Sequence, residues 1–322
     1  MASSREYLDF ILEQLSGLEN IACRTMMGEF ILSYRGRRQL KRMRELDVSV
    51  IKDAVAELFV HANYHLGEDV QACLKQCAQR EETALAREVF ESIGKNIEIA
   101  GEGVFPLCQD TGMACVFMEI GQDVHLTGGS LYDAVNEGVR KACAEGYLRQ
   151  TIVEDPFRRK NTGDSTPADI NVDIVPGENV RIIMAPKGFG SENMSQIRMM
   201  TPADGLEGAE DFIVRVCEEA GGRPCPPMIV GVGVGGNFSR AALNAKKALL
   251  RPIGEHNEDP YYADMEKRVL ERINALDIGP QGFGGKTTAL AVNVIAAPTH
   301  IAGLPVAVNI NCHVSRHEEV TL

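Results

Sequence analysis

The sequence predicts an α/β fold with a mixed sheet and a helical N-terminal region. From about residue 47 to residue 100 the chain is rich in Glu, Lys, Ala and Leu, and apolar residues recur at helical spacing. Beyond residue 100, short apolar strands alternate with amphipathic helices. This alternation is typical of an α/β or mixed architecture. The 322 residues suffice for a substantial core.

Residues 1–42 differ from the rest of the chain. They combine an amphipathic run, a short apolar piece and a basic cluster that we interpret as a solvated linker. A clean helical pattern begins near Met43 and places Ile51, Val55 and Phe59 on one face. We therefore expect residues 1–42 to be an appendage and residues 43–322 to be the functional unit. The appendage resembles the first helix and hairpin of the TfoX competence-regulator N-terminal domain, cut short.

Later segments carry clear strand and helix patterns. Residues 169–175 and 180–186 alternate apolar and polar side chains around a Pro-Gly-Glu-Asn turn, which predicts a β-hairpin. Two amphipathic helices follow, and we expect them to end at Gly221 and Gly279. Short apolar strands are expected at residues 228–236 and 303–311.

The composition argues against several classes of protein. The formal net charge of −12 disfavours nucleic acid as the main partner, because phosphate binding needs clustered cations. There is no run of about eighteen uncharged apolar residues, so we expect no membrane span. The first ten residues lack a basic region followed by an apolar one, so we expect a cytoplasmic protein.

Three of the nine cysteines lie in loop contexts. These are Cys108, Cys225 and Cys312. Cysteines within helical patterns, such as Cys143, are expected to be buried packing residues. Three loop cysteines could ligate an iron–sulfur cluster and leave one iron open as a Lewis acid. On spacing alone, packing is the more frequent role of such cysteines, and a zinc-stabilised interaction protein is a further alternative.

The stretch GVGVGG is a second motif to weigh. Gly231, Gly233 and Gly236 fit the dinucleotide-binding pattern, so a nucleotide-binding oxidoreductase is an alternative function. A dinucleotide fold would next need a strand ending in an acidic residue, but Pro252 and Gly254 interrupt the corresponding segment. We therefore interpret the glycines as tight packing of a strand–helix turn beside the Cys225 loop.

Seven separate segments together resemble one known family in the same order. They lie at residues 106–117, 159–170, 185–195, 225–236, 248–254, 276–294 and 298–313. From about Met43 onward the chain resembles the α subunit of the class I, iron–sulfur fumarate hydratase and tartrate dehydratase family. The resemblance implies an Fe–S hydro-lyase α-subunit fold and a [4Fe-4S] cluster held by Cys108, Cys225 and Cys312.

The resemblance also implies a set of residues around the substrate. Arg149 would clamp a carboxylate, Gly190 would offer a backbone N–H, and Asp110 with His300 would form a polar relay near the iron. Gln109 is expected to bind substrate in the same place. Lys286, in a glycine-rich segment that fails the phosphate-loop pattern, is expected to be a further cation facing the anionic substrate.

The implied reaction is the reversible dehydration of (S)-malate to fumarate, and L-tartrate dehydratase is the alternative. Residues 187–195 and 309–317 look like the fumarate hydratase type. Single-chain family members continue into a C-terminal domain, whereas this sequence ends ten residues after Cys312. We therefore expect a β subunit as partner, a small dicarboxylate as substrate, and a higher-order αβ oligomer.

Overall fold

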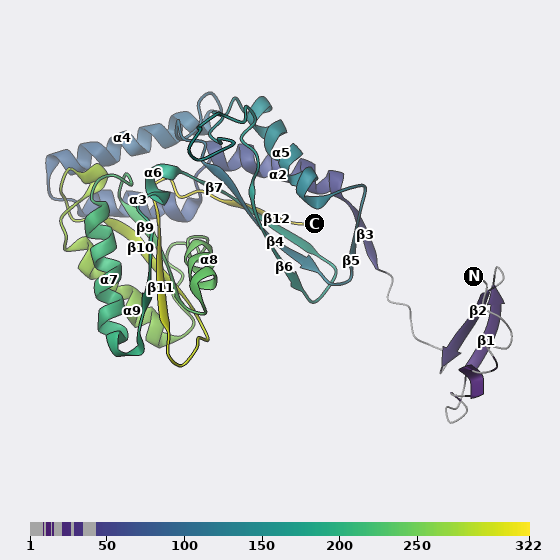
Figure 1. The fold of residues 1–322 in the computed structure, drawn as a ribbon. Coiled ribbons are helices and arrows are strands. Elements are labelled where there is room, and N and C mark those ends of the chain that lie inside the picture. Colours follow the sequence, from purple (N-terminus) through teal and green to yellow (C-terminus); the bar gives the residue numbers. More distant parts are fainter. Residues whose placement is uncertain (1–8, 10, 14, 16–20, 27–28, 35–42) are drawn as a thin grey trace.

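The computed structural model describes residues 9, 11–13, 15, 21–26, 29–34 and 43–322 (Figure 1). Two strands, β1 (Ile21–Met26) and β2 (Glu29–Tyr34), pair antiparallel before residue 43. The proposed resemblance of residues 1–42 to a TfoX segment falls largely outside the described residues. From residue 43 onward, helices and mixed sheets build the α/β architecture that the sequence predicts.

The helical N-terminal region is confirmed as three helices: α2 (Val48–Tyr64), α3 (Glu68–Arg80) and α4 (Ala84–Gly101). Asp47 caps α2 by accepting from the Ser49 N–H at 2.8 Å, and Thr83 caps α4 through Ala86. The start of the unit differs from the prediction, because β3 (Arg44–Asp47) is a short strand that pairs parallel with β5 (Val124–Thr127). The helix therefore begins one turn later than its pattern indicates.

The first four-stranded sheet has the order β12-β7-β4-β6. Its strands are β4 (Met113–Gly121), β6 (Asp169–Val175), β7 (Val180–Lys187) and β12 (Glu318–Thr321). Helices α2 and α5 (Leu131–Glu145) pack on it, and their apolar side chains share one core with β4 and β7. That core includes Ile51, Phe59, Val116, Val139 and Met184, each essentially buried.

The predicted hairpin of β6 and β7 is wrong, because β4 lies between them. β4 pairs parallel with β6 and antiparallel with β7. The connection after β6 wraps over the end of β4, where the Gly121 N–H donates to the Asn179 carbonyl at 2.8 Å. An added Cβ at Gly121 would lie 2.4 Å from the Gly177 carbonyl oxygen. The turn chemistry was recognised correctly, but its partner strand comes from a distant part of the sequence.

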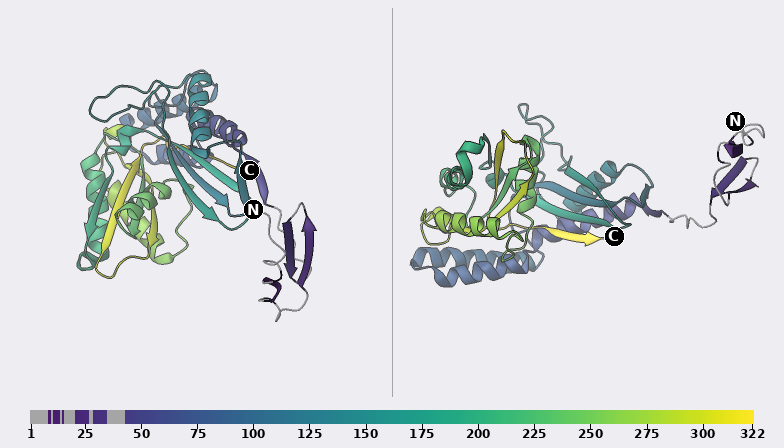
Figure 2. Two further views of the ribbon diagram at one scale, coloured as in Figure 1. Left: turned by 45° about the vertical axis from the view of Figure 1, so that its right-hand side comes forward. Right: turned by 90° about the horizontal axis from the view of Figure 1, so that it is seen from below.

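The second four-stranded sheet has the order β10-β9-β11-β8. Its strands are β8 (Gln196–Met200), β9 (Met228–Gly235), β10 (Ala289–Ala297) and β11 (Leu304–Asn311). Figures 1 and 2 show α7 (Gly205–Ala220) and α9 (Pro260–Asn274) on one side of this sheet and α8 (Phe238–Ala248) on the other. α7 ends at Gly221 as predicted, whereas α9 ends at Asn274, before Gly279.

The glycines of β9 let α8 approach the sheet closely. An added Cβ at Gly231 would lie 2.1 Å from the Ala245 carbonyl oxygen, and one at Gly233 would lie 2.0 Å from that of Ala241. No real Cβ fits at those distances, so the packing interpretation of this motif is confirmed.

Three short segments complete the element order. They are the four-residue helix α6 (Phe189–Glu192) and the two 3-10 turns η1 (Pro202–Asp204) and η2 (Pro280–Gly282). After β11 the chain leaves the second sheet and returns to the first, where β12 pairs with β7 (Figures 1 and 2). Within the described ranges, no helix combines the length and the apolar character needed to cross a bilayer.

Candidate functional site

Cys108 lies in the loop that leads from α4 into β4. Hydrogen bonds from two helices hold this loop: the Leu107 N–H donates to the Asn63 carbonyl at 2.8 Å, and Asn96 Nδ2 donates to the Leu107 carbonyl at 2.9 Å. The thiol is partly buried and accepts from the Asp110 N–H, with the nitrogen 3.4 Å from Sγ. The loop therefore presents a fixed sulfur at the start of a buried strand.

Cys225 and Cys312 lie at the same end of the second sheet. Cys225 precedes β9 and Cys312 follows β11, and these two strands run antiparallel. The carbonyl of Cys225 accepts from the His313 N–H at 3.3 Å, and His313 Nδ1 lies 3.0 Å from the same oxygen. Cys225 has a positive φ of 55°. A non-glycine residue with a positive φ is uncommon.

Cys108 lies close enough to each of the other two thiols to influence it electrostatically. Cys108 and Cys312 pack against the same apolar core, which contains Leu107, Ile229 and Val314. Burial raises the pKa of the Cys225 thiol, and a negative charge on Cys108 raises it further. Burial also raises the pKa of Cys312, and Cys108 again adds to the increase. Loops from distant parts of the sequence thus bring Cys225 and Cys312 each within electrostatic range of Cys108.

The donor set suits an iron–sulfur cluster better than a single ion. Among the described residues, no group of three or more His, Cys, Asp or Glu side chains is arranged to hold one metal ion. The thiolates of a cluster bind separate irons, so they need not meet at one point. Backbone N–H groups of Asp110 and Val314 also point to Cys108 and Cys312. Such hydrogen bonds to sulfur are typical of cluster sites.

A cavity of about 680 Å³ adjoins the Cys108 loop. Its lining includes Asp110, Arg149, Arg159, Phe189 and Asn193. The Asp110 carboxylate is held in place, because Oδ1 accepts from the Gly112 N–H at 3.0 Å and Oδ2 from the Phe189 N–H at 2.8 Å. One fixed carboxylate and two arginines in one cavity suit an anionic substrate that loses or gains a proton.

Gln109 and Gly190 flank this cavity. Gln109 is exposed, and its Oε1 lies 3.4 Å from Cys108 Sγ. Gly190 is an exposed residue of α6, next to the cavity residue Phe189. An added Cβ at Gly190 would meet nothing closer than the Arg223 carbonyl oxygen at 3.9 Å, so local space does not require glycine there. Substrate binding by either residue stays a prediction.

His300 lies at the opposite end of the second sheet from the cysteines. It belongs to the loop between β10 and β11, where Thr299 donates to the Gly236 carbonyl at 2.9 Å. β11 then runs eight residues to the end of the sheet where Cys312 lies. At about 3.3 Å per residue this is about 25 Å. The expected relay between Asp110 and His300 is therefore not formed within one chain.

Lys286 lies apart from the cavity as well. Its ammonium pairs with the carboxylate of Glu82, and its backbone N–H donates to Glu81 at 3.0 Å. The segment is thereby attached to the start of α4 rather than to the loops that carry Asp110 and Arg149. The structure gives Lys286 an ion pair in place of the free cation that the sequence suggested.

Comparison with known proteins identifies the family. A family model described as fumarate hydratase (Fumerase) matches residues 52–321. The chain is 41% identical over 271 residues to the "putative L(+)-tartrate dehydratase subunit alpha" of Methanocaldococcus jannaschii, which covers 83% of this chain and 95% of the relative. The chain belongs to the iron–sulfur fumarate hydratase and tartrate dehydratase family. This confirms the family expected from the sequence.

A second relative supports the same assignment. The L(+)-tartrate dehydratase subunit alpha of Escherichia coli K12 is 30% identical over 273 residues, with 84% of this chain and 89% of the relative covered. The fumarate hydratase and tartrate dehydratase family consists of hydro-lyases, and its iron–sulfur members generally use a [4Fe-4S] cluster. Family membership and the packing role of the β9 glycines leave the nucleotide-binding oxidoreductase without support.

Sequence reasoning missed a buried ion pair beside the family's cysteine site. Lys187 ends β7, and its Nζ donates to the Ile310 carbonyl at 2.7 Å and to Ser191 Oγ at 3.1 Å. The Glu192 carboxylate lies 3.1 Å from the same nitrogen and 2.6 Å from Lys246 Nζ. This network joins the first sheet to the end of β11. The sequence signal for this ion pair was the position of Lys187 directly after an apolar strand. In that segment the sequence analysis considered only Gly190.

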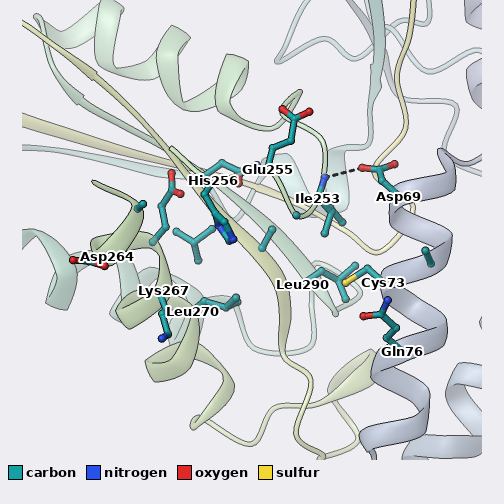
Figure 3. Close-up of a pocket in the computed structure, with 17 residues that line it drawn as sticks. Asp69, Cys73, Gln76, Ile253, Glu255, His256, Asp264, Lys267, Leu270 and Leu290 are labelled. Carbon is teal, nitrogen blue, oxygen red and sulfur yellow. Dashed lines mark hydrogen bonds between the residues drawn. The ribbon is translucent and has the colours of Figure 1, made fainter. Parts of the chain in front are cut away.

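A second cavity, of about 560 Å³, lies between α3, α9 and the segment before α9 (Figure 3). Asp69, Cys73, His256 and Lys267 are among its lining residues, and Asp69 accepts from the Ile253 N–H at 2.7 Å. It contains none of the residues predicted for the site. The cavity beside Cys108 is therefore the candidate site.

Proposed function

We propose that this chain is the α subunit of a [4Fe-4S]-dependent hydro-lyase that dehydrates a 2-hydroxy dicarboxylate, with L(+)-tartrate as its substrate. The proposal is supported by the electrostatic influence of Cys108 on Cys225 and on Cys312, next to a cavity that Asp110 and Arg149 line. The named relatives are tartrate dehydratase subunits, and this weighs against the malate expected from the sequence. Malate remains the second candidate, because the matching family model is described as fumarate hydratase.

The chain's own residues suit the binding and proton-transfer parts of such an elimination. A bound cluster with one iron free of protein ligands supplies a Lewis acid for the leaving hydroxyl. Arg149 and Arg159 supply guanidinium groups for the two substrate carboxylates. Two backbone N–H groups orient the Asp110 carboxylate, so it can hold a proton at a defined position without rearranging.

We also propose that a β subunit covers this face of the molecule. Large apolar side chains are exposed on the same loops that carry the site. Tyr147 is 89% exposed two residues before Arg149, and Phe157 is 92% exposed within the cavity loop. Val104 and Phe105 are exposed just before Cys108. Exposed apolar residues of this size around one site are typical of surfaces that a partner covers. The relatives, moreover, are named α subunits.

The test is anaerobic reconstitution of the chain with iron and sulfide, followed by addition of the β subunit. We expect about four irons and four sulfides per chain. We then expect kcat/KM for L(+)-tartrate to exceed that for (S)-malate by about tenfold or more, a difference of at least about 1.4 kcal/mol in transition-state binding. The reverse preference would support malate. A colourless protein without iron would overturn the assignment.

A further inference from the structure

Arg316 joins two of the cysteine loops. It lies in the segment that crosses from β11 to β12, four residues after Cys312, and is 4% exposed. Its Nη2 donates to the backbone carbonyls of Asp110 at 2.7 Å and Thr111 at 3.3 Å, and to Asn63 Oδ1 at 3.2 Å. One guanidinium therefore fixes the chain after Cys312 against the loop that carries Cys108.

The charge of Arg316 has no carboxylate to balance it. Within residues 43–322 and the other described positions, no Asp or Glu oxygen lies within ion-pair distance of its guanidinium. Its Nε is buried without a hydrogen-bond partner in the described structure. Other basic groups near or in the core differ, because Lys187 pairs with Glu192 and Arg251 with Glu266. An unpaired buried charge is costly, so a fold that keeps one indicates a missing anion.

The cysteines are the groups positioned to supply that anion. Cys312 precedes Arg316 by four residues in the same segment, and Cys312 and Cys108 both pack against the apolar core that contains Leu107 and Val314. The carbonyls that Arg316 binds lie two and three residues after Cys108. Cysteine ligates metal as the thiolate, so three cysteines carrying a cluster bring net negative charge into this buried region.

We propose that Arg316 is the buried counter-charge of the cluster and the residue that fixes the positions of the Cys108 and Cys312 loops relative to each other. It is a positioning residue, since it acts through the cysteines and does not line the substrate cavity. The inference rests on the proposed cluster and goes beyond it, because neither the sequence motifs nor the comparisons assign a role to Arg316.

The test compares apo and reconstituted forms of three variants under anaerobic conditions. Arg316→Met removes the charge, Arg316→Lys keeps it, and Arg268→Met is the control because Arg268 pairs with Glu210 away from the cysteines. Thermal unfolding gives the gain in midpoint on reconstitution, which reports binding of the cluster to the folded state. We expect Arg316→Met to lose at least about half of this gain. Arg316→Lys should keep most of it, and Arg268→Met all of it.

Two further readouts separate charge from shape. Removing a nearby cation disfavours an added electron, so the cluster of Arg316→Met should have a more negative reduction potential. Its iron should also pass to a chelator about tenfold faster or more. A merely structural role would lower the apo and reconstituted midpoints equally and leave the potential unchanged, and that result would overturn the inference.

The outcomes also distinguish this inference from the proposed function. Wild-type protein that takes up no iron and sulfide contradicts the cluster itself. Wild-type protein that takes up the cluster, with an unchanged gain and potential in Arg316→Met, contradicts only the counter-charge. If Arg316→Met does not fold, Arg316→Lys decides. A retained rise in midpoint and a retained potential support the counter-charge. Loss of the rise in midpoint on reconstitution overturns it.

Discussion

The contact between β9 and α8 gives a sharp prediction for Gly233→Ala. The new methyl group would lie 2.0 Å from the Ala241 carbonyl oxygen and 2.7 Å from the Ala245 nitrogen. Both atoms are helix backbone, so no flexible side chain can move aside. Overpacking of a core usually costs 1–3 kcal/mol, and a backbone clash belongs at the upper end, about 3 kcal/mol.

Thermal unfolding followed by circular dichroism measures this cost. Because the entropy of unfolding is about 2.1 cal/mol/K per residue, each kcal/mol shifts the midpoint of a chain of this size by about 1.5–2 °C, so Gly233→Ala should lower it by about 5 °C. Gly94→Ala is the matched control, because an added Cβ there meets nothing within 4 Å in the middle of α4. It should stabilise the protein by about 0.5–1 kcal/mol, since alanine favours a helix interior.

Calorimetric titration with NAD completes the experiment. We expect no binding by the wild type or by either variant, because the glycines serve packing. An unchanged midpoint for Gly233→Ala would refute the steric argument. Wild-type binding of NAD that Gly233→Ala abolishes, without loss of stability, would restore the dinucleotide interpretation.

Three further predictions concern the cysteines, the buried charges and a helix cap. Cys312→Ser should lose the iron and sulfide of reconstituted protein, whereas Cys143→Ser should keep them; equal loss would mean that packing has been mistaken for ligation. Burial acts to raise the pKa of Glu192, but the charges of Lys187 and Lys246 outweigh it and hold the pKa at about 2. This stabilisation is complete above the usual glutamate pKa of about 4.3 and is lost as pH falls toward 2. Between these pH values the free energy of unfolding of Glu192→Gln should therefore fall by about 3 kcal/mol less than that of the wild type. Thr83→Ala should cost about 1 kcal/mol in urea unfolding, because α4 loses its N-cap.

Local patterns predicted individual elements well and their pairing poorly. The periodicity of residues 47–100 gave the helical region, and Gly221 marked the end of α7. The β6–β7 hairpin failed because the pairing partner of both strands, β4, lies about fifty residues earlier in the chain. Alternation of side chains shows that a segment is a strand, but it carries no information about which strand lies beside it.

The sequence likewise predicted some residues of the candidate site and missed others. The family resemblance selected Cys108, Cys225 and Cys312, and in the structure Cys108 influences the other two electrostatically; their joint ligation of a cluster stays a prediction. His300 failed to join them, because a motif does not show at which end of a strand its residues lie, and Lys286 pairs with Glu82 instead. Arg316 could not be predicted for another reason. A charged residue in a sequence is expected to be exposed, and only the fold reveals one that is buried without a carboxylate partner.

The crossing of the chain between the two sheets has a consequence for the lifetime of the protein. Cys108 leads into a strand of the first sheet, whereas Cys225 and Cys312 border the second. A cluster held by all three would act as a cross-link that closes two long stretches of chain and holds the sheets together. Its removal by oxidants would free the connecting segments to open locally, and open segments are cleaved by proteases. Damage to the cofactor would thereby mark the damaged molecule for degradation.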